Sequence, residues 1–297
     1  MKGITVSVVG IGRVGLPLAL VLADGGLKVN GIGRNQEKIK LLNKKIMPFM
    51  EKGADQLLKK YVNKNLFFTT DYQVINESEI IILTLGTPVD ENMNPVLDQI
   101  DQSLEQMTPY LKKNQLIILR STISPKTTFY VKEKIELKTK FKVGKSIFLA
   151  FCPERIIEGK AFEELGNLPQ IISAFDAGTL EHIKQLFGQI AKQIVVSVSP
   201  VEAELSKLFC NTWRYISFAV ANQFFMIASE YNLDYHNIYR AMTENYDRMK
   251  DLPRPGFAAG PCLLKDTMQL AAFGNNNFFL GHSAMLVNVG LPAFLMK

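Results

Sequence analysis

Short apolar runs alternate with longer helical or polar segments through the first two thirds of the chain. The runs have the length of β-strands and occupy residues 4–9, 28–33, 66–70, 79–85, 115–121, 146–151 and 170–175. Strands that alternate with helical segments predict a doubly wound α/β fold around a parallel sheet, in which ligands bind at the carboxyl ends of the strands. We therefore expect such a domain over residues 1–198.

The last third of the chain predicts helices. Residues 201–231 contain no Gly or Pro, and apolar positions recur at helical spacing along the whole stretch. This pattern predicts one long helix with apolar side chains on more than one side, which is either buried within the monomer or forms a subunit interface. We expect a homodimer through this helix, and an α-helical central or dimerisation domain over residues 199–297.

The first strand runs directly into the sequence GIGRVG, which has the pattern G-x-G-x-x-G, and a helical stretch follows. Glycines permit a tight turn and a close backbone approach, and a helix N-terminus attracts a pyrophosphate. A Rossmann-type dinucleotide site is therefore expected, although an ordinary βαβ corner is the alternative. The residues expected to contact the cofactor are Gly10, Gly12, Val14, Gly15, Arg34, Thr87 and Thr122.

The second strand ends at Gly33, which is followed by Arg34 and Asn35. Dinucleotide folds commonly place an acidic residue here, on the ribose 2′-hydroxyl. No carboxylate is present to reject a 2′-phosphate, and Arg34 can pair with one, so NADP is weighed against NAD. The alternative for Arg34 is a solvated cation at the start of a helix.

Composition narrows the class of protein. The chain has 297 residues, of which 47% are hydrophobic, and it can bury a substantial core, most simply in two domains. No apolar run reaches the ~18 residues that span a bilayer, and no signal peptide is recognisable, so we expect a soluble cytoplasmic protein without a membrane partner. The net charge of +6 is spread along the chain, which argues against nucleic acid and favours phosphorylated small molecules.

Three distant cysteines suggest neither a disulfide framework nor a metal site. Cys152 and Cys210 are expected to be small buried side chains. Cys262 differs because it lies between a Pro- and Gly-rich loop and a predicted helix over 263–273, whose first amides can favour a thiolate. A thiolate beside a hydride acceptor allows a second oxidation, from an aldehyde through a thiohemiacetal and a thioester to a carboxylate. Two cofactors would then be reduced per substrate.

Lys207 and Asn211 lie four residues apart on the long predicted helix, so they share one face among apolar neighbours. A buried lysine is costly unless it is paired or used in chemistry. The alternative is a surface lysine whose stem covers apolar neighbours. Lys265 and Asp266 fall in the first turn of the predicted helix after Cys262.

Taken in order, GIGRVGLPLA, the TP-x-D-x-N loop, STISPKTT, CPER, the Lys207–Asn211 pair and GPCLLKD resemble the nucleotide-sugar 6-dehydrogenases, the UDP-glucose and GDP-mannose dehydrogenase superfamily, over essentially the whole chain. The resemblance implies NAD-dependent oxidation of the C6 hydroxyl of a nucleotide sugar to a uronate, in a pathway of extracellular polysaccharide or glycan synthesis. CPER and GPC look most like members that act on UDP-N-acetylhexosamines, particularly UDP-N-acetylmannosamine.

The same resemblance implies roles for individual residues. Cys262 would be the nucleophile of the thiohemiacetal and thioester stages. Lys207 would stabilise the developing oxyanion, with Asn211 beside it as a hydrogen-bond donor. Asp266 would help to hold a water that acts as base for the alcohol, and Thr122 would support that water.

A second group of residues is implied on the substrate side. Glu154 is the candidate for activating the hydrolytic water, whereas the role of Glu158 is less defined. Lys265 is assigned local structure or a substrate contact. The residues expected to bind substrate are Glu154, Arg155, Glu158, Lys207, Asn211 and Lys265.

The chain departs from the family pattern in two places. Gly33 and Arg34 replace the usual acidic residue, which puts the family's NAD preference in doubt. The sequence stops at LPAFLMK, where the family continues into a third, nucleotide-binding domain, so we expect that domain to be absent. If the chain is a fragment of such a protein, cofactor binding and dimerisation can survive while substrate affinity and turnover fail.

Two rival functions remain open. A β-hydroxyacid dehydrogenase of the 6-phosphogluconate type resembles this chain in its lysine–asparagine helix but has no use for the thiol. The other rival is a non-catalytic protein that binds the cofactor after loss of the third domain.

Overall fold

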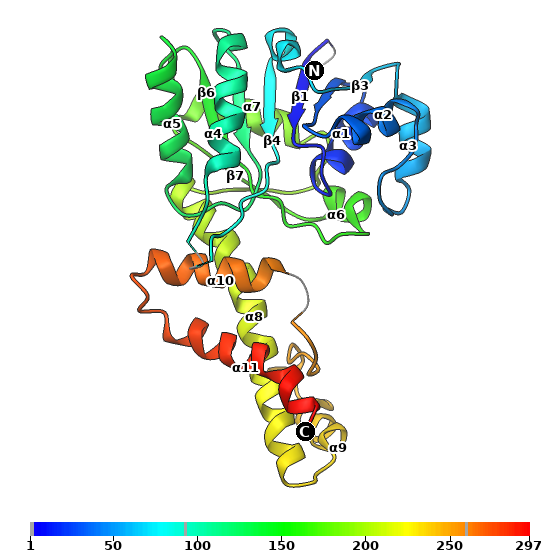
Figure 1. Cartoon of the computed structure of the whole chain (residues 1–297), viewed down its shortest axis with the longest axis vertical. Helices are drawn as coiled ribbons and strands as arrows, with labels where there is room; N and C mark the ends of the chain where they lie inside the picture. Colours follow the sequence, from blue (N-terminus) through cyan, green and yellow to red (C-terminus); the bar gives the residue numbers. More distant parts are fainter. Residues whose placement is uncertain (1–2, 92–93, 259–260) are drawn as a thin grey trace. The chain divides into compact units, whose positions relative to one another are not determined.

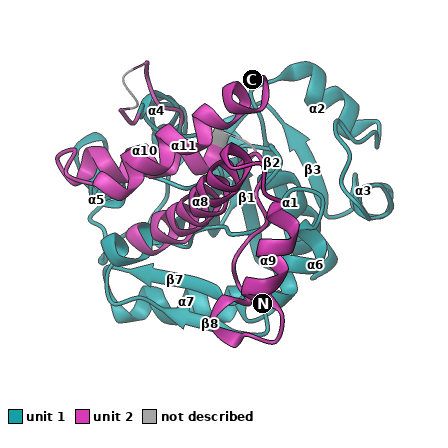
Figure 2. Ribbon diagram, turned by 90° about the horizontal axis from the view of Figure 1, so that it is seen from below, with its two compact units in different colours: residues 1–87, 96–204 teal, residues 88–95, 205–297 magenta. Residues whose placement is uncertain are grey.

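The computed structural model describes residues 3–91, 94–258 and 261–297 (Figure 1). The chain divides into two compact units (Figure 2): unit 1 contains residues 1–87 and 96–204, and unit 2 contains residues 88–95 and 205–297. The sequence did not indicate that residues 88–95, from the loop after the fourth strand, group with the helical unit.

Unit 1 is built on one eight-stranded sheet of order β3-β2-β1-β4-β5-β6-β7-β8. Its strands are β1 (Thr5–Val9), β2 (Lys28–Ile32), β3 (Leu66–Thr69), β4 (Ile80–Leu83), β5 (Leu116–Leu119), β6 (Phe148–Phe151), β7 (Gln170–Ala174) and β8 (Ile194–Val196). All neighbouring strands are parallel except β6 and β7. The doubly wound fold is confirmed, with two corrections: β7 runs antiparallel to β6, and β8 was not predicted.

Helices cover both faces of this sheet, which is why β4, β5 and β6 are apolar throughout rather than alternating. The described α-helices of unit 1 are α1 (Gly15–Asp24), α2 (Gln36–Asn43), α3 (Ala54–Tyr61), α4 (Asp98–Met107), α5 (Thr127–Lys138), α6 (Ala161–Asn167) and α7 (Ala177–Phe187), with short 3₁₀ turns at Tyr72–Glu77 and Thr108–Tyr110. Ile82 and Ile118 belong to one apolar cluster, together with side chains from α1, α3 and α7. Ile81 and Ile117 belong to a second cluster, with side chains from α4 and α5. Each face of the sheet therefore has its own core.

Helix α8 (Pro200–Glu230) starts in unit 1 and continues through unit 2, as the apolar periodicity predicted. The other helices described in unit 2 are α9 (Tyr235–Thr243), a 3₁₀ turn at Asp247–Met249, α10 (Pro261–Phe273) and α11 (Phe279–Leu295). Buried Asn222 of α8 donates to Asn288 Oδ1 of α11 at 2.9 Å, and Asn288 Nδ2 donates to the Tyr215 carbonyl at 3.0 Å. These amides fix the register of the two helices, because each would be costly to bury without a partner.

The described helices include none that is both long and apolar enough to cross a membrane.

Candidate active site

The glycine turn after β1 has two glycines that its own packing requires. A Cβ on Gly10, whose φ is +100°, would lie 2.5 Å from the Thr84 carbonyl oxygen, and a Cβ on Gly15 would lie 2.1 Å from the Gly10 carbonyl oxygen. Gly12 is different, because a Cβ there would meet no atom within 4 Å among the described residues. Val14 directly precedes α1. The turn thus leaves bare backbone at Gly12, where a dinucleotide pyrophosphate would approach the N-terminus of α1.

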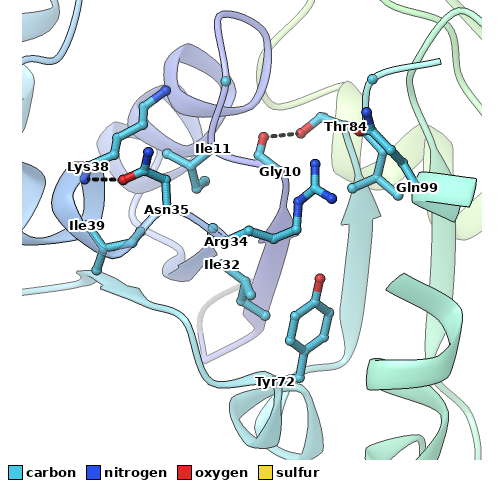
Figure 3. A pocket seen from close by; sticks show the side chains of 14 residues that line it. Gly10, Ile11, Ile32, Arg34, Asn35, Lys38, Ile39, Tyr72, Thr84 and Gln99 are labelled. Carbon is cyan, nitrogen blue, oxygen red and sulfur yellow. Dashed lines mark hydrogen bonds between the residues drawn. The ribbon is translucent and has the colours of Figure 1, made fainter. Parts of the chain in front are cut away.

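A pocket of about 260 Å³ opens beside this turn, at the carboxyl ends of β1, β2 and β4 (Figure 3). Its lining residues are Gly10, Ile11, Gly12, Ile32, Gly33, Arg34, Asn35, Lys38, Ile39, Tyr72, Thr84, Leu85, Gly86 and Gln99. Thr84 Oγ1 donates to the Gly10 carbonyl at 2.6 Å, which ties the loop after β4 to the glycine turn. The size, the position and the glycine backbone fit the adenosine half of a dinucleotide.

Cations gather around this pocket. In Figure 3 the side chains of Arg34 and Lys38 leave the β2–α2 turn in different directions. The Lys38 ammonium and the Arg13 guanidinium lie 5.1 and 5.2 Å from the centre of the Phe49 ring. Burial, and secondarily the neighbouring Arg13, lower the pKa of Lys38 below its ordinary value. Exposed Arg13 pairs with Glu158 at 3.4 Å, so the predicted substrate residue Glu158 lies next to the glycine turn.

The loops after β4 and β5 meet at the predicted threonines. Thr87 Oγ1 donates to the Thr122 carbonyl oxygen. In the TP-x-D-x-N loop, Asp90 accepts from the Asn94 backbone amide at 2.8 Å, whereas Asn92 and Met93 lie outside the described residues. The two threonines are thus brought together at one edge of the sheet of unit 1.

Buried Glu204, near the start of α8, holds the STISPKTT loop. Its carboxylate accepts from the backbone amides of Lys126 at 2.6 Å and Thr128 at 2.8 Å, and from Thr128 Oγ1 at 2.5 Å. Burial raises the pKa of Glu204. Lys126 has a left-handed backbone with φ +73°, and the carboxylate fixes this conformation at the start of α5. The sequence analysis missed Glu204, although a glutamate within an otherwise apolar helical face was visible.

Glu154 is tightly held in the loop after β6. One carboxylate oxygen accepts from Arg120, a fully buried side chain that follows β5. The other oxygen accepts from the backbone amides of Arg155 at 2.7 Å and Ile156 at 3.2 Å. Arg120 also donates to Gln170 Oε1 at 2.9 Å. The carboxylate is therefore oriented, because each of its oxygens accepts at least one hydrogen bond.

Arg120 was not predicted, and its signal was a cation placed directly after the all-apolar stretch LIIL. The side chain of predicted Arg155 donates to the carbonyl of Pro169, the residue directly before β7, and so holds the start of that strand. Farther along the loop after β6, buried Glu51 accepts from the Gly159 and Ala161 amides at 2.9 and 3.1 Å. This loop is thus anchored at both ends.

Unit 2 contains a connected group of buried polar side chains. Lys207, only 8% exposed, donates to Asn211 Oδ1 at 3.3 Å. Asn211 Nδ2 donates to Asp266 Oδ2 at 2.5 Å, and the Lys265 ammonium lies 3.0 Å from Asp266 Oδ1. These contacts bring together four of the predicted residues, from α8 and from the first turns of α10.

Cys262 lies one helical turn before Asp266 on α10, so the exposed thiol shares a helix face with the buried carboxylate. It is the second residue of this helix and not a residue of the preceding loop, while Gly260 of the GPC segment lies outside the described residues. The thiol is therefore accessible at the edge of the buried polar group.

The other two cysteines behave differently from each other. Cys152 is buried as predicted, and burial raises the pKa of its thiol to about 12. The prediction for Cys210 is wrong, because this side chain is exposed on α8. Phe209, its apolar neighbour in KLFCNT, is itself 54% exposed, and Trp213 farther along α8 is 70% exposed.

Two family descriptions match the chain. Residues 4–191 match the NAD-binding domain of the UDP-glucose/GDP-mannose dehydrogenase family, and residues 201–288 match its central domain. The chain belongs to the UDP-glucose/GDP-mannose dehydrogenase family. Unit 1 contains the family's NAD-binding domain, whose glycine turn and pocket are described above.

Curated relatives support the same placement. The UDP-N-acetyl-D-mannosamine dehydrogenase of Pyrococcus horikoshii is 28% identical over 97% of this chain and 69% of its own length. The enzyme of the same name from Methanococcus maripaludis strain C7 is 30% identical over 98% of this chain and 66% of its own length. The solved structure of the P. horikoshii UDP-D-ManNAc dehydrogenase matches with a TM-score of 0.93 at 27% identity, over 99% of this chain and 70% of that one. The chain thus spans about two thirds of the relatives that it matches.

Proposed function

We propose that the chain is a nucleotide-sugar 6-dehydrogenase that oxidises the C6 hydroxyl of UDP-N-acetylmannosamine to a carboxylate. One observation carries the proposal: the buried Lys207–Asn211–Asp266 group lies one helical turn from an exposed thiol at Cys262. Membership of the family, and the names of the relatives described above, support the substrate class.

When bound, the nicotinamide cofactor supplies the hydride acceptor for both oxidations. In the first oxidation the alcohol loses its proton to a base and becomes an aldehyde. We assign the base to a water held by Asp266, whose carboxylate is oriented by Asn211 and by Lys265 at 3.0 Å. We assign Thr87 and Thr122 to the cofactor side, because they follow neighbouring strands of unit 1.

In the second oxidation the Cys262 thiolate adds to the aldehyde carbon, and the resulting thiohemiacetal loses a hydride to become a thioester. Addition of the thiolate places negative charge on the former carbonyl oxygen, and loss of the hydride restores its double bond and removes the charge. The Lys207 ammonium and the Asn211 amide are proposed to stabilise that charge, which a buried donor does more strongly than a solvated one. Water then cleaves the thioester and regenerates the thiol, so one alcohol and one water yield a carboxylate and two reduced cofactors.

Glu154 is proposed to orient the hydrolytic water. Its two oxygens accept from Arg120 and from two backbone amides, but an ionised carboxylate has about four acceptor sites, so capacity remains for a water. Glu158 and Arg155 are proposed to shape the side of the same loop that faces the substrate. Lys265 is proposed to contact the substrate.

A homodimer through α8 is proposed from the exposed apolar side chains of that helix. They recur at steps of three, four and seven residues, which places them in one stripe. The stripe consists of Phe209, Trp213, Val220, Phe224 and Ile227 of α8, and exposed Tyr231 directly follows the helix.

The test is to count the reduced cofactors per sugar consumed, with UDP-N-acetylmannosamine, UDP-N-acetylglucosamine, UDP-glucose and GDP-mannose, each with NAD or NADP. We expect two per UDP-N-acetylmannosamine, and no carboxylate from Cys262→Ala. Cys210→Ala is the matched control, because it removes another exposed thiol and should leave the yield unchanged.

The same experiment distinguishes the alternatives. A β-hydroxyacid dehydrogenase would oxidise a hydroxy acid once, and Cys262→Ala would leave it active. A cofactor-binding remnant would bind the dinucleotide and turn over none of the sugars.

A further inference from the structure

The cofactor pocket lacks a carboxylate at the end of β2. In dinucleotide folds an acidic residue at this place accepts the ribose hydroxyls and repels a 2′-phosphate. Here the place belongs to Gly33, where an added Cβ would come within 3.1 Å of the Ile39 side chain. The described residues that line the pocket include no Asp or Glu. The described lining of the pocket therefore carries no negative charge that would repel an additional phosphate.

Two cations that line the pocket follow Gly33 in the sequence, Arg34 and Lys38. The exposed Arg34 guanidinium donates to the neutral Gln102 Oε1 at 3.3 Å, and Lys38 lies half-buried in the first turn of α2. Within the described part of the chain, neither side chain has an ion pair with a carboxylate. Burial and the like charge of Arg13 lower the pKa of Lys38. Positive charge without a counter-ion, in a pocket suited to a nucleotide, favours an anionic ligand.

We infer that this end of the pocket binds the 2′-phosphate of NADP, with Arg34 as its ligand and Lys38 as a second positive charge in the pocket lining. A phosphate monoester carries nearly two negative charges at neutral pH, and a guanidinium can donate two parallel N–H bonds to it. Asn35 is a positioning residue: its Oδ1 accepts from the Lys38 backbone amide at 2.9 Å and so fixes the first turn of α2. The inference rests on the dinucleotide dependence of the proposed function but concerns the binding step alone.

The test is to measure the dissociation constants of NADP⁺ and NAD⁺ for the full chain by isothermal titration calorimetry. We expect NADP⁺ to bind at least ~10-fold more tightly, since a charge-assisted contact present in one ligand alone separates their affinities by roughly this factor. A second pair of ligands has equal charge: 2′,5′-ADP should bind more tightly than 3′,5′-ADP. Equal affinities within either pair would overturn the inference, because they would indicate NAD use or general attraction to a basic surface.

Two single-charge variants sharpen the result. Arg34→Ala should weaken the binding of NADP⁺ roughly 10- to 100-fold while changing the affinity for NAD⁺ by less than about twofold. Lys40→Ala, on α2, is the matched control, because Lys40 pairs with Glu37 at 2.9 Å and is not among the residues that line the pocket. Equal losses in both variants would also overturn the inference. Since binding requires no turnover, a chain that binds NADP⁺ but oxidises no sugar would contradict the proposed function and leave this inference intact.

Discussion

At the scale of single residues, Arg120 holds the carboxylate on which the loop after β6 depends. Its side chain is fully buried and pairs with Glu154, whose side chain is 5% exposed. Removing one partner of a buried pair leaves the other charge desolvated and uncompensated. Arg120→Met should therefore lower the free energy of unfolding by about 3–5 kcal/mol, measured by urea denaturation.

The double variant Arg120→Met/Glu154→Gln is the control for this pair, because it removes both charges and should recover part of the loss. If Arg120→Met costs less than about 1 kcal/mol, the value typical of an exposed pair, the carboxylate is not held as described.

Single residues were the least predictable part of the site. Lys207, Asn211 and Asp266 could be proposed because helical spacing and motif order are local properties of the sequence. Arg120 could not, because its partner Glu154 lies 34 residues away and a cation after a strand usually indicates a solvated loop. Cys210 was misplaced because apolar neighbours indicate burial only where another element covers that side of the helix.

At the scale of elements, two glycines of the turn after β1 have different roles: Gly15 is required for packing, and Gly12 is expected to face the cofactor. Gly15→Ala should destabilise the chain by about 1–3 kcal/mol, because its Cβ would lie 2.1 Å from the Gly10 carbonyl oxygen. Gly12→Ala should change stability by less than about 0.5 kcal/mol, because its Cβ meets open space, but should weaken dinucleotide binding at least ~10-fold. Thermal denaturation and isothermal titration of both variants measure the contrast, and equal behaviour would show that Gly12 does not face the cofactor.

Helix α8 carries the prediction about assembly. Trp213 is 70% exposed within the apolar stripe, so Trp213→Glu should shift the chain from dimer to monomer in light scattering after size exclusion. Leu137→Glu, on the 83% exposed Leu137 of α5, should leave the mass unchanged. A wild-type chain that is monomeric at micromolar concentration would contradict the proposed dimer.

Elements were easier to predict than residues. Seven strands follow from short apolar runs, because the sheet is covered on both faces, and α8 follows from apolar periodicity and the absence of Gly and Pro over residues 201–231. Strand β8 was not predicted because it has only three residues, of which Val195 and Val196 are about half exposed. The antiparallel direction of β7 was not predictable, since strand direction depends on the connection and not on the apolar pattern.

At the scale of the whole molecule, the two matched domains bring different chemistry. Unit 1 contains the NAD-binding domain, with a pocket beside its glycine turn, whereas unit 2 holds the Lys207–Asn211–Asp266 group and Cys262. The relatives are longer than this chain, which spans about two thirds of their length.

The most direct measurement is the mass of the Cys262 peptide after acid quenching during turnover with UDP-N-acetylmannosamine and the oxidised cofactor. The account predicts a covalent sugar-nucleotide adduct on Cys262, lost on treatment with hydroxylamine, and no adduct on Cys210 or without cofactor. Production of the uronate by Cys262→Ala, or turnover with every cysteine peptide unmodified, would contradict the thioester mechanism.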